Sequence, residues 1–280
     1  MDKETAKNIR ESLKADCSNC FGLCCTALNI VASSDFAINK NAGTPCPNLN
    51  DEFRCKIHQN LREKGFKGCT VFDCLGAGQK VSQNIFNGQN WRENPEIAEK
   101  MFSVFPVMEQ LYEMIAFISE ALTYEVSFSL HDNLNQQLEK LQNLTDMDAD
   151  SLLSIDLVMC RFPIKELLLE TSQYIRSELS SKVFAIKKGK ECSGADWIGK
   201  NFSGKDLRTT DLRGAYLIAT DLRNTDLRGV DFIGADLRDA NLSGANLSTS
   251  LFLTQMQINS AKGNEKTILP SHLQRPYHWI

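Results

Sequence analysis

The sequence lacks the features that direct a chain into or across a membrane. Its first residues, Met-Asp-Lys-Glu-Thr-Ala-Lys, contain no apolar core of a signal peptide. The longest apolar region, residues 114–130, is interrupted by Glu120 and Glu125 and is not expected to form a spanning helix. We therefore expect a soluble, cytoplasmic protein without a membrane partner.

A strong net charge is also absent. The chain has 31 Lys and Arg residues against 35 Asp and Glu residues, which gives a net charge of −4 and a pI near 5.7. This balance provides no electrostatic reason for binding nucleic acid, so no nucleic-acid partner is expected. It indicates no particular oligomeric state.

No catalytic constellation stands out in the chain. His131, His272 and His278 share no spacing with a nucleophile or a pair of carboxylates that would suggest acid–base or nucleophilic chemistry. The sequence therefore favours a non-enzymatic protein.

Glycine is missing between Gly88 and Gly189, which predicts a helical middle. Asn94-Pro95-Glu96 is typical of a helix start, and Pro106 is expected to kink or divide the helix that follows. We expect these helices to form a small bundle on the preceding segment. Three more are predicted: near residues 133–144, after Asp148 or Asp150, and from Pro163.

Residues 195–254 repeat with a period of five, over twelve consecutive steps. Side chains realign every 3.6 residues in a helix and every 2.0 in a strand, so neither element explains the period. Four steps that form the sides of a square would close a coil of 20 residues, and coils would stack about 4.8 Å apart. The apolar centres would point inward; they are Trp197, Phe202, Leu207, Leu212, Leu217, Leu222, Leu227, Phe232, Leu237, Leu242, Leu247 and Phe252.

The two residues that precede each apolar centre are also restricted in type. A small residue stands two before it, except at Lys200 and Lys205, and Asp or Asn stands one before it in ten of the twelve steps. The two lysines should extend outward, so we expect the first coil to be distorted or covered by a neighbouring element. At the other end, residues 254–263 predict a short capping helix, and the apolar tail 269–280 should fold back onto the body.

The steps 235–239, 240–244 and 245–249, Ala-Asp-Leu-Arg-Asp, Ala-Asn-Leu-Ser-Gly and Ala-Asn-Leu-Ser-Thr, resemble the pentapeptide-repeat family. The resemblance implies a right-handed quadrilateral β-helix of about three coils. The expected fold class is thus α+β and multidomain: a cysteine-rich, metal-binding domain over residues 1–90, a helical bundle over 91–190, and the β-helix with its capping helix and tail over 191–280.

Cysteine is concentrated near the N-terminus, where eight of the ten lie within 58 residues. In a reducing compartment, clustered thiols hold metal more often than they form disulfides. Zinc or an iron–sulfur cluster takes four thiolates, so the eight could serve two sites, or one site with spare thiols. The predicted metal ligands are Cys17, Cys20, Cys24, Cys25, Cys46, Cys55, Cys69 and Cys74.

The segment 17–57, with its early cysteine pair, adjacent Cys24-Cys25 and later single cysteines, resembles a family of zinc- or iron-chelating domains. This resemblance implies metal binding but neither a particular metal nor a reaction. His58 follows Cys55 at a ligand-like spacing and could complete a Cys3His site, but a surface or capping histidine is the favoured interpretation. Cys160 and Cys192 are isolated and are expected to act as small buried apolar residues.

Three function classes fit these features: a protein-binding scaffold with a structural metal centre, a metal- or redox-linked regulator or enzyme centred on the cysteines, and a DNA mimic that protects topoisomerase. Three coils would span only about 15 Å, a length of duplex that carries about nine phosphates. Residues 195–254 contain eight Asp and seven Lys or Arg, a net charge of −1. A short, neutral solenoid is a poor DNA mimic, so the scaffold with an unidentified protein partner is the preferred hypothesis.

Overall fold

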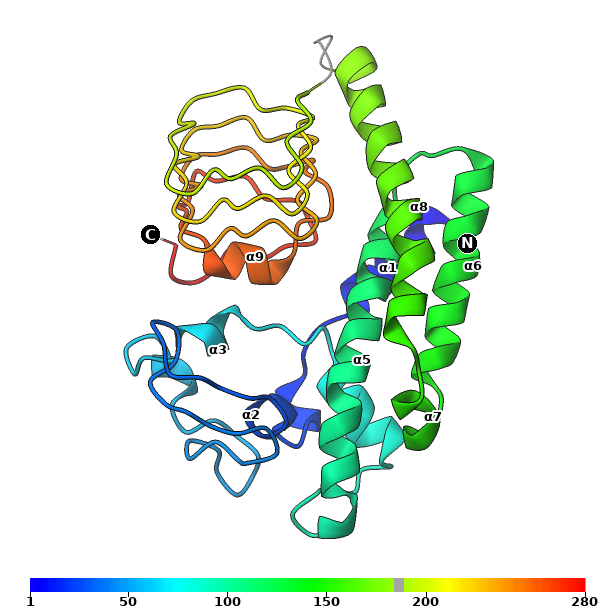
Figure 1. Ribbon diagram of the computed structural model, residues 1–280, viewed down its shortest axis with the longest axis vertical. Coiled ribbons are helices and arrows are strands. Elements are labelled where there is room, and N and C mark those ends of the chain that lie inside the picture. The colour runs from blue at the N-terminus through cyan, green and yellow to red at the C-terminus, as the bar shows by residue number, and fades with distance from the viewer. Residues whose placement is uncertain (184–188, 280) are drawn as a thin grey trace. The chain divides into compact units, whose positions relative to one another are not determined.

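The computed structural model describes residues 1–183 and 189–279 and is shown in Figure 1. The chain forms two compact units. Unit 1 comprises residues 1–123 and 131–167, and unit 2 comprises residues 124–130 and 168–280. The division between the units falls within two helices, α6 (Phe128–Thr145) and α8 (Leu157–Glu178).

Unit 1 contains one complete long helix, most of α6, the first half of α8 and many short helices. The long helix is α5, Pro95–Ala121. The short helices before it are α1 (Lys3–Ser12), the 3-10 turn η1 (Cys17–Asn19), α2 (Leu23–Thr26), the 3-10 turn η2 (His58–Asn60), α3 (Lys67–Val71), α4 (Ala77–Gln79) and the π-helical segment η3 (Lys80–Ile85); α7 (Ala149–Leu153) follows α6.

Helix α5 is the core element of unit 1. It begins at Pro95, as predicted, and contacts α1, α2, α4, η3 and α7. Its buried face includes Met101, Phe105, Met108 and Leu111, which are at most 1% exposed. By length and composition α5 could cross a membrane, but half of its most apolar window is buried inside the structure, as in the core helix of a globular unit.

The predicted start of the last helix was wrong, because α8 begins at Leu157 rather than at Pro163. Helix α5 continues past Pro106 and is not divided there, so of the two predicted effects of Pro106 the division does not occur. A proline removes one hydrogen bond but does not have to end a helix when the surrounding turns are packed. The start of α8 is fixed by Asp156, whose carboxylate accepts from the backbone N–H groups of Val158 and Met159 at 3.0 and 3.1 Å.

In unit 2, residues 191–268 form a stack of four-sided turns, which we call the repeat coil (Figure 1). From Glu191–Asp211 to Asp231–Leu251, parallel bridges join residues 20 apart, so the predicted register is confirmed. The last two bridges, Asn241–Lys262 and Asn246–Ile268, join residues 21 and 22 apart. Each step repeats the same backbone hydrogen bonds. Leu207 N–H donates to the Asp226 carbonyl at 3.0 Å, Thr209 N–H donates to the Arg228 carbonyl at 2.9 Å, and a tight turn joins Thr210 N–H to the Leu207 carbonyl at 3.1 Å.

The predicted fold class was wrong. Across residues 1–183 and 189–279, helices are the only regular elements, and no strand or sheet is formed, so the α+β class with a quadrilateral β-helix does not apply. The reason lies in the five-residue step itself. Each bridging residue is followed by a single inward residue and then by a two-residue turn, so the bridges of the repeat coil stay isolated and no ladder extends along a side.

The recurring Asp or Asn has a local role in these turns. In all ten steps that contain it, the side-chain oxygen accepts a hydrogen bond from the backbone N–H two residues later, as Asp206 does from Arg208 at 3.1 Å. Asp and Asn stabilise turns in this way. The sequence period therefore records both an inward apolar residue and a turn-forming residue.

The first coil of the repeat differs from the others, as predicted. Lys200 and Lys205 are exposed, and the stacked rings of Trp197 and Phe202 are only partly buried, whereas the later centres are buried. Within unit 2, the C-terminal half of α8 continues into the π-helical segment η4 (Leu179–Val183) and covers part of this coil through Arg176.

The end of the coil is covered by helix α9, Gln255–Ser260. Its Gln257 side chain donates to the carbonyls of Phe232 and Ala235, at 2.8 and 2.9 Å, and its Ile258 joins the core of the coil. The tail folds back as well: the Trp279 indole is buried and donates to the Ala261 carbonyl at 3.1 Å. The predicted capping helix and returning tail are confirmed.

Candidate metal centre

All eight clustered cysteines lie in unit 1 and are free thiols. Most are half-buried; Cys17 is exposed and Cys46 is buried. Among the described residues, no three His, Cys, Asp or Glu side chains are gathered closely enough to hold a metal ion as they stand. The thiols nevertheless fall into two groups, which differ in the elements that position them.

The first group comprises Cys17, Cys20, Cys24 and Cys74, which line one small cavity together with α4 and the Phe105 ring of α5. The volume of this cavity is about 20 Å³. A cavity of 10–15 Å³ admits about one water molecule, so the space between these four thiols is that of a single small ion.

Side-chain hydrogen bonds hold the two chain segments of this cavity together. Gln79 accepts from Asp16 N–H at 3.0 Å and donates to the Lys14 carbonyl at 2.7 Å. Ser82 and Gln83 bind the backbone of Phe21 and Asn19. The loop that contains Cys17 and Cys20 is therefore fixed against the segment that follows Cys74.

Glycines allow the thiols of this group to lie close to the backbone. A Cβ atom placed on Gly78 would lie 2.7 Å from the Cys20 sulfur, closer than real Cβ contacts allow. Burial raises the pKa of both Cys20 and Cys74, and this rise is opposed by the N–H groups of Leu23 and Gly22 at Cys20 and by those of Gly78 and Gly76 at Cys74. Backbone N–H groups that point at sulfur favour the ionised form that metals bind.

The second group comprises Cys25, Cys46, Cys55 and Cys69. Cys46 N–H donates to the Cys25 carbonyl at 2.9 Å, and Cys55 bridges to Leu49, three residues after Cys46. Burial raises the pKa of Cys69 to about 12, and repulsion from Cys25, Cys46 and Cys55 adds to this rise. These four thiols thus share one electrostatic environment.

A buried lysine accompanies the second group. Lys40 is 5% exposed, and its ammonium group donates to the carbonyls of Thr26, Leu28 and Asn41. In the described part of the chain no carboxylate forms an ion pair with it. Burial lowers the pKa of Lys40, and the charges of Cys46, Cys25 and Cys24 raise it, so the cysteines are the source of countercharge for this cation.

The two groups adjoin at Cys24 and Cys25, whose sulfur atoms are 4.0 Å apart. A hydrogen bond from the Cys24 thiol holds the pKa of Cys25 below its usual value, and the charge of Lys40 acts in the same direction. Burial raises the pKa of Cys20 to about 11. Without a cation, most of these sulfurs would remain protonated at neutral pH, and metal binding would have to release protons.

A stack of four aromatic rings joins the cysteine segment, residues 14–75, to the residues around the start of α5. The rings of Phe21, Phe53, Trp91 and Phe102 follow one another at centroid distances of 5.3 to 5.5 Å. The Trp91 indole donates to the Phe21 carbonyl at 2.8 Å, and the guanidinium of Arg54 binds the Cys17 and Ser18 carbonyls. The stack ties residues 17–21 to the turn before Cys55 and to the start of α5.

The remaining candidates lie outside both groups. His58 is exposed, which agrees with a surface histidine. Cys160 is buried, as predicted, whereas Cys192 is only partly buried, against the core of the repeat coil. The division into two groups was not predicted from the sequence. Gly76 and Gly78 follow Cys74 by two and four residues, and a Cβ atom on Gly78 would lie too close to the Cys20 sulfur. These glycines are the feature of the sequence that could have indicated that Cys74 lies near Cys20.

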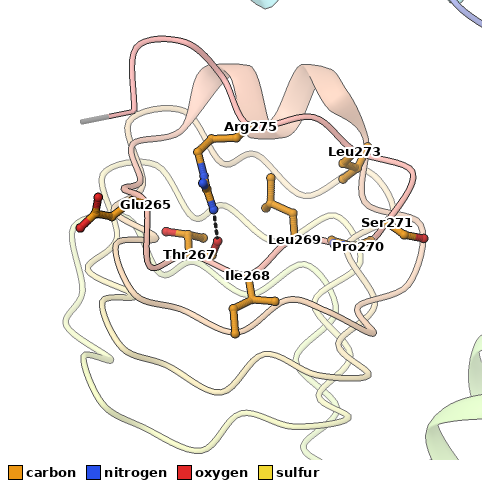
Figure 2. A pocket seen from close by; sticks show the side chains of 8 residues that line it. All are labelled: Glu265, Thr267, Ile268, Leu269, Pro270, Ser271, Leu273 and Arg275. Carbon is orange, nitrogen blue, oxygen red and sulfur yellow. Dashed lines mark hydrogen bonds between the residues drawn. The ribbon is translucent and has the colours of Figure 1, made fainter.

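A second cavity lies in the C-terminal tail and is shown in Figure 2. It has a volume of about 350 Å³, and its one guanidinium, that of Arg275, donates to the Thr267 carbonyl at 2.9 Å. Its lining residues include no cysteine or histidine and form no nucleophile–base pair. They are Glu265, Thr267, Ile268, Leu269, Pro270, Ser271, Leu273 and Arg275. This cavity gives no support for a catalytic reaction.

The stacked five-residue steps define a protein with pentapeptide repeats: residues 210–248 match the family described as Pentapeptide repeats, in eight copies. The chain belongs to the family of YybG from Bacillus subtilis (strain 168), described as an uncharacterized protein. It is 52% identical to YybG over 272 residues, which cover 97% of this chain and 96% of YybG.

Two solved structures share the repeats. The pentapeptide repeat protein Rfr23 from the cyanobacterium Cyanothece 51142 is 25% identical, with a TM-score of 0.23, over 28% of this chain and 52% of that one. A pentapeptide repeat protein from the Arabidopsis thaliana thylakoid lumen is 29% identical, with a TM-score of 0.15, over 28% of this chain and 61% of that one. The chain thus spans about half to three fifths of the length of these proteins, and TM-scores this low carry no structural argument.

Proposed function

We propose that this protein is a non-enzymatic scaffold, in which the repeat coil presents its outer sides to a protein partner and a structural metal centre holds the cysteine segment together. The observation that carries the proposal is the small cavity lined by four of the eight thiols, Cys17, Cys20, Cys24 and Cys74; the buried ammonium group of Lys40 accompanies the other four. Neither feature adjoins a nucleophile–base pair among the described residues.

The outer sides of the coil support a role in protein binding. Five arginines each form a two-pronged ion pair with the aspartate two residues before them; they are Arg208, Arg213, Arg223, Arg228 and Arg238. These pairs produce a regular, nearly neutral surface on a rigid stack. Solenoids commonly bind partners through extended surfaces of this kind.

The same pairs count against DNA mimicry. A DNA mimic needs unpaired negative charge, but most aspartates of the coil are paired with arginine, and Asp211 and Asp231 are buried. A supercoiling assay of gyrase with the purified protein tests this alternative. Inhibition that is lost on neutralising Asp206, Asp226 and Asp236, which are less buried than Asp211 and Asp231, would favour DNA mimicry over the scaffold.

One observation favours a metal- or redox-linked regulator as the second candidate. The Cys24 and Cys25 sulfurs are 4.0 Å apart, and the lowered pKa of Cys25 is typical of a reactive thiol. Metal analysis of the full chain, purified without oxygen, separates the two candidates. Bound zinc supports the structural centre, whereas a coloured iron–sulfur species supports redox sensing. A folded, metal-free protein with four disulfides would overturn both.

The scaffold itself is tested by site-specific photocrosslinking in the native host. A crosslinker at exposed Arg223 on the coil should capture a defined protein, and the same group at exposed Lys100 in unit 1 serves as the matched control. The captured protein is then purified and its binding to the full chain is measured. Equal capture from both positions, or no binding after purification, would contradict the proposal.

A further inference from the structure

We infer that the eight cysteines form two separate tetrathiolate sites, each for one zinc-type divalent ion: Cys17, Cys20, Cys24 and Cys74 in the first, and Cys25, Cys46, Cys55 and Cys69 in the second. This inference rests on the proposed structural metal centre and deepens it. Of the two arrangements left open by the sequence, it favours two complete sites over a single site with spare thiols. The two sites adjoin at the peptide bond between Cys24 and Cys25.

The first argument is the donor set of the first site. Four thiols from two chain segments, residues 17–24 and Cys74, line a cavity of about 20 Å³, too small for a four-iron cluster and sufficient for one ion. Zinc binds four thiolates in a tetrahedron with Zn–S distances of about 2.3 Å. As they stand the four sulfurs are not gathered around one point, so ion binding requires them to move toward a common centre.

The second argument is the chain connection between the groups. Cys24 and Cys25 are consecutive residues of α2, and consecutive side chains of a helix leave it in different directions. Their sulfurs are 4.0 Å apart, so the two groups adjoin at this point. Cys24 lines the first cavity, whereas the backbone of Cys25 is bound to that of Cys46.

The third argument is the buried charge of Lys40. Its three carbonyl acceptors satisfy its hydrogen bonds but not its charge, and an uncompensated buried cation is strongly unfavourable. A zinc ion with four thiolates has a net charge of −2, which Lys40 would partly neutralise. The lysine is thus a positioning residue for the second site, where it stabilises the charge of the bound complex.

The experiment counts zinc in the full chain, purified without oxygen from zinc-supplemented cells. The unaltered protein should contain two zinc ions. The paired change Cys20→Ser with Cys74→Ser should leave one, and Cys46→Ser with Cys55→Ser should also leave one. The mixed pair Cys74→Ser with Cys46→Ser should leave none, and the control pair Cys160→Ser with Cys192→Ser should leave two.

Each other outcome has a definite meaning. If the pair of changes within one proposed site, Cys20→Ser with Cys74→Ser or Cys46→Ser with Cys55→Ser, removes all the metal, the cysteines form one shared centre and the division into two sites is wrong. If the mixed pair leaves one ion, the cysteines are partitioned differently. If the unaltered protein is folded and contains no metal, the proposed function fails together with the inference, a result distinct from both of these.

A second measurement covers the case in which the paired variants do not fold. Cadmium NMR of the unaltered, cadmium-substituted protein should give two signals in the tetrathiolate region, and a single signal would overturn the inference. Lys40→Met should speed loss of one of the two ions to a chelator about tenfold, as expected when an outer partner of a ligand is removed. The exposed Lys56, beside Cys55, provides the control Lys56→Met, which should leave both rates unchanged. Equal rates for Lys40→Met and the unaltered protein would contradict the role of Lys40.

Discussion

In the repeat coil, every five-residue step repeats the same backbone hydrogen bonds and buries the same kind of side chain, from Leu207 to Leu247. In the cysteine segment, residues 14–75, the chain forms only single-turn helices and two isolated antiparallel bridges. The coil is therefore stabilised by local repetition, whereas the cysteine segment joins distant residues through side chains. Two regions of similar length in one chain can thus be ordered by different physical means.

This difference predicts that the repeat coil and the cysteine segment unfold independently of each other. Each coil contacts the coils beside it, so its stability is close to a sum of neighbour terms. The cysteine segment has no such repeated term, and under the proposal its order depends on ions bound by its thiols. The predictions below test this contrast, from the largest expected effect to the smallest.

Removing the metal should unfold the cysteine segment and spare the coil. Structural zinc supplies on the order of 10 kcal/mol, more than the stability of many small domains. After chelation, hydrogen exchange should become fast in residues 15–75 and remain slow around Leu212, Leu222 and Phe232, which are fully buried. Retained protection in residues 15–75 would show that the thiols are not a structural centre. Loss of protection in the coil as well would show that the two regions are not separable.

The outcome of the sequence predictions follows the same contrast. The 20-residue register and the inward centres were predictable because each step contains its own signal, an apolar residue and a turn-forming Asp or Asn. The absence of strands was not predicted, since the period alone does not reveal that a turn interrupts every side. The resemblance to a known repeat family led to the wrong fold class at this point.

The cysteine segment shows where prediction from the sequence ends. The spacing of Cys17 and Cys20 indicates a chelating pair, but Cys74 lies 54 residues after Cys20, and no period connects them. Their proximity depends on Gln79, Ser82 and Gln83, polar residues without a distinctive pattern. The start of α8 was missed for another reason, because the capping signal of Asp156 was outweighed by the later proline.

Removing Arg176 should destabilise the covered end of the repeat coil. Its side chain is fully buried and donates to the Thr209 carbonyl at 2.9 Å and to Glu191 at 2.7 Å, with Asp211 at 3.4 Å. Breaking a buried ion pair costs about 3–5 kcal/mol because the remaining charge is left without its partner. Arg176→Ala should therefore lower the melting temperature of unit 2 strongly. Arg223→Ala, at an exposed pair with Asp221, should cost at most about 1 kcal/mol; equal losses would contradict this account.

The register of the coil is tested at its centre. Leu227 is fully buried and stacks between Leu207 and Leu247, whereas Asn224 is exposed at a turn with a φ of 54°. Leu227→Ala should leave a cavity and cost about 2–5 kcal/mol. Asn224→Gly should be close to neutral, because glycine adopts positive φ without strain. Thermal melts of both variants provide the measurement, and equal, small losses would show that Leu227 does not face the core.

The smallest expected effect concerns a buried carboxylate in the coil. Burial raises the pKa of Asp231 to about 6, from an ordinary value of 3.8, against opposing interactions with Ser172, the Ile233 N–H and Arg213. A carboxyl group with a raised pKa in the folded state disfavours folding once it is ionised. The loss of folding free energy caused by ionised Asp231 is therefore absent well below pH 4. It grows as the pH rises toward about 6 and is constant above that value.

Asp231→Asn isolates this term, since an amide oxygen can still accept from the Ile233 N–H, now 2.9 Å from the carboxylate. The variant should gain stability relative to the unaltered protein between pH 5 and pH 7.5, by about 1–2 kcal/mol, because a shift of one pH unit corresponds to 1.36 kcal/mol. Hydrogen exchange of residues 210–250, corrected for the intrinsic rate at each pH, gives the difference. Asp221→Asn is the control: a side-chain hydrogen bond from Arg223 lowers the pKa of Asp221, so neutralising it should give no such gain. A stability difference for Asp231→Asn that does not change across this pH range would show that Asp231 does not titrate there, and that its burial in the coil is compensated by Arg213.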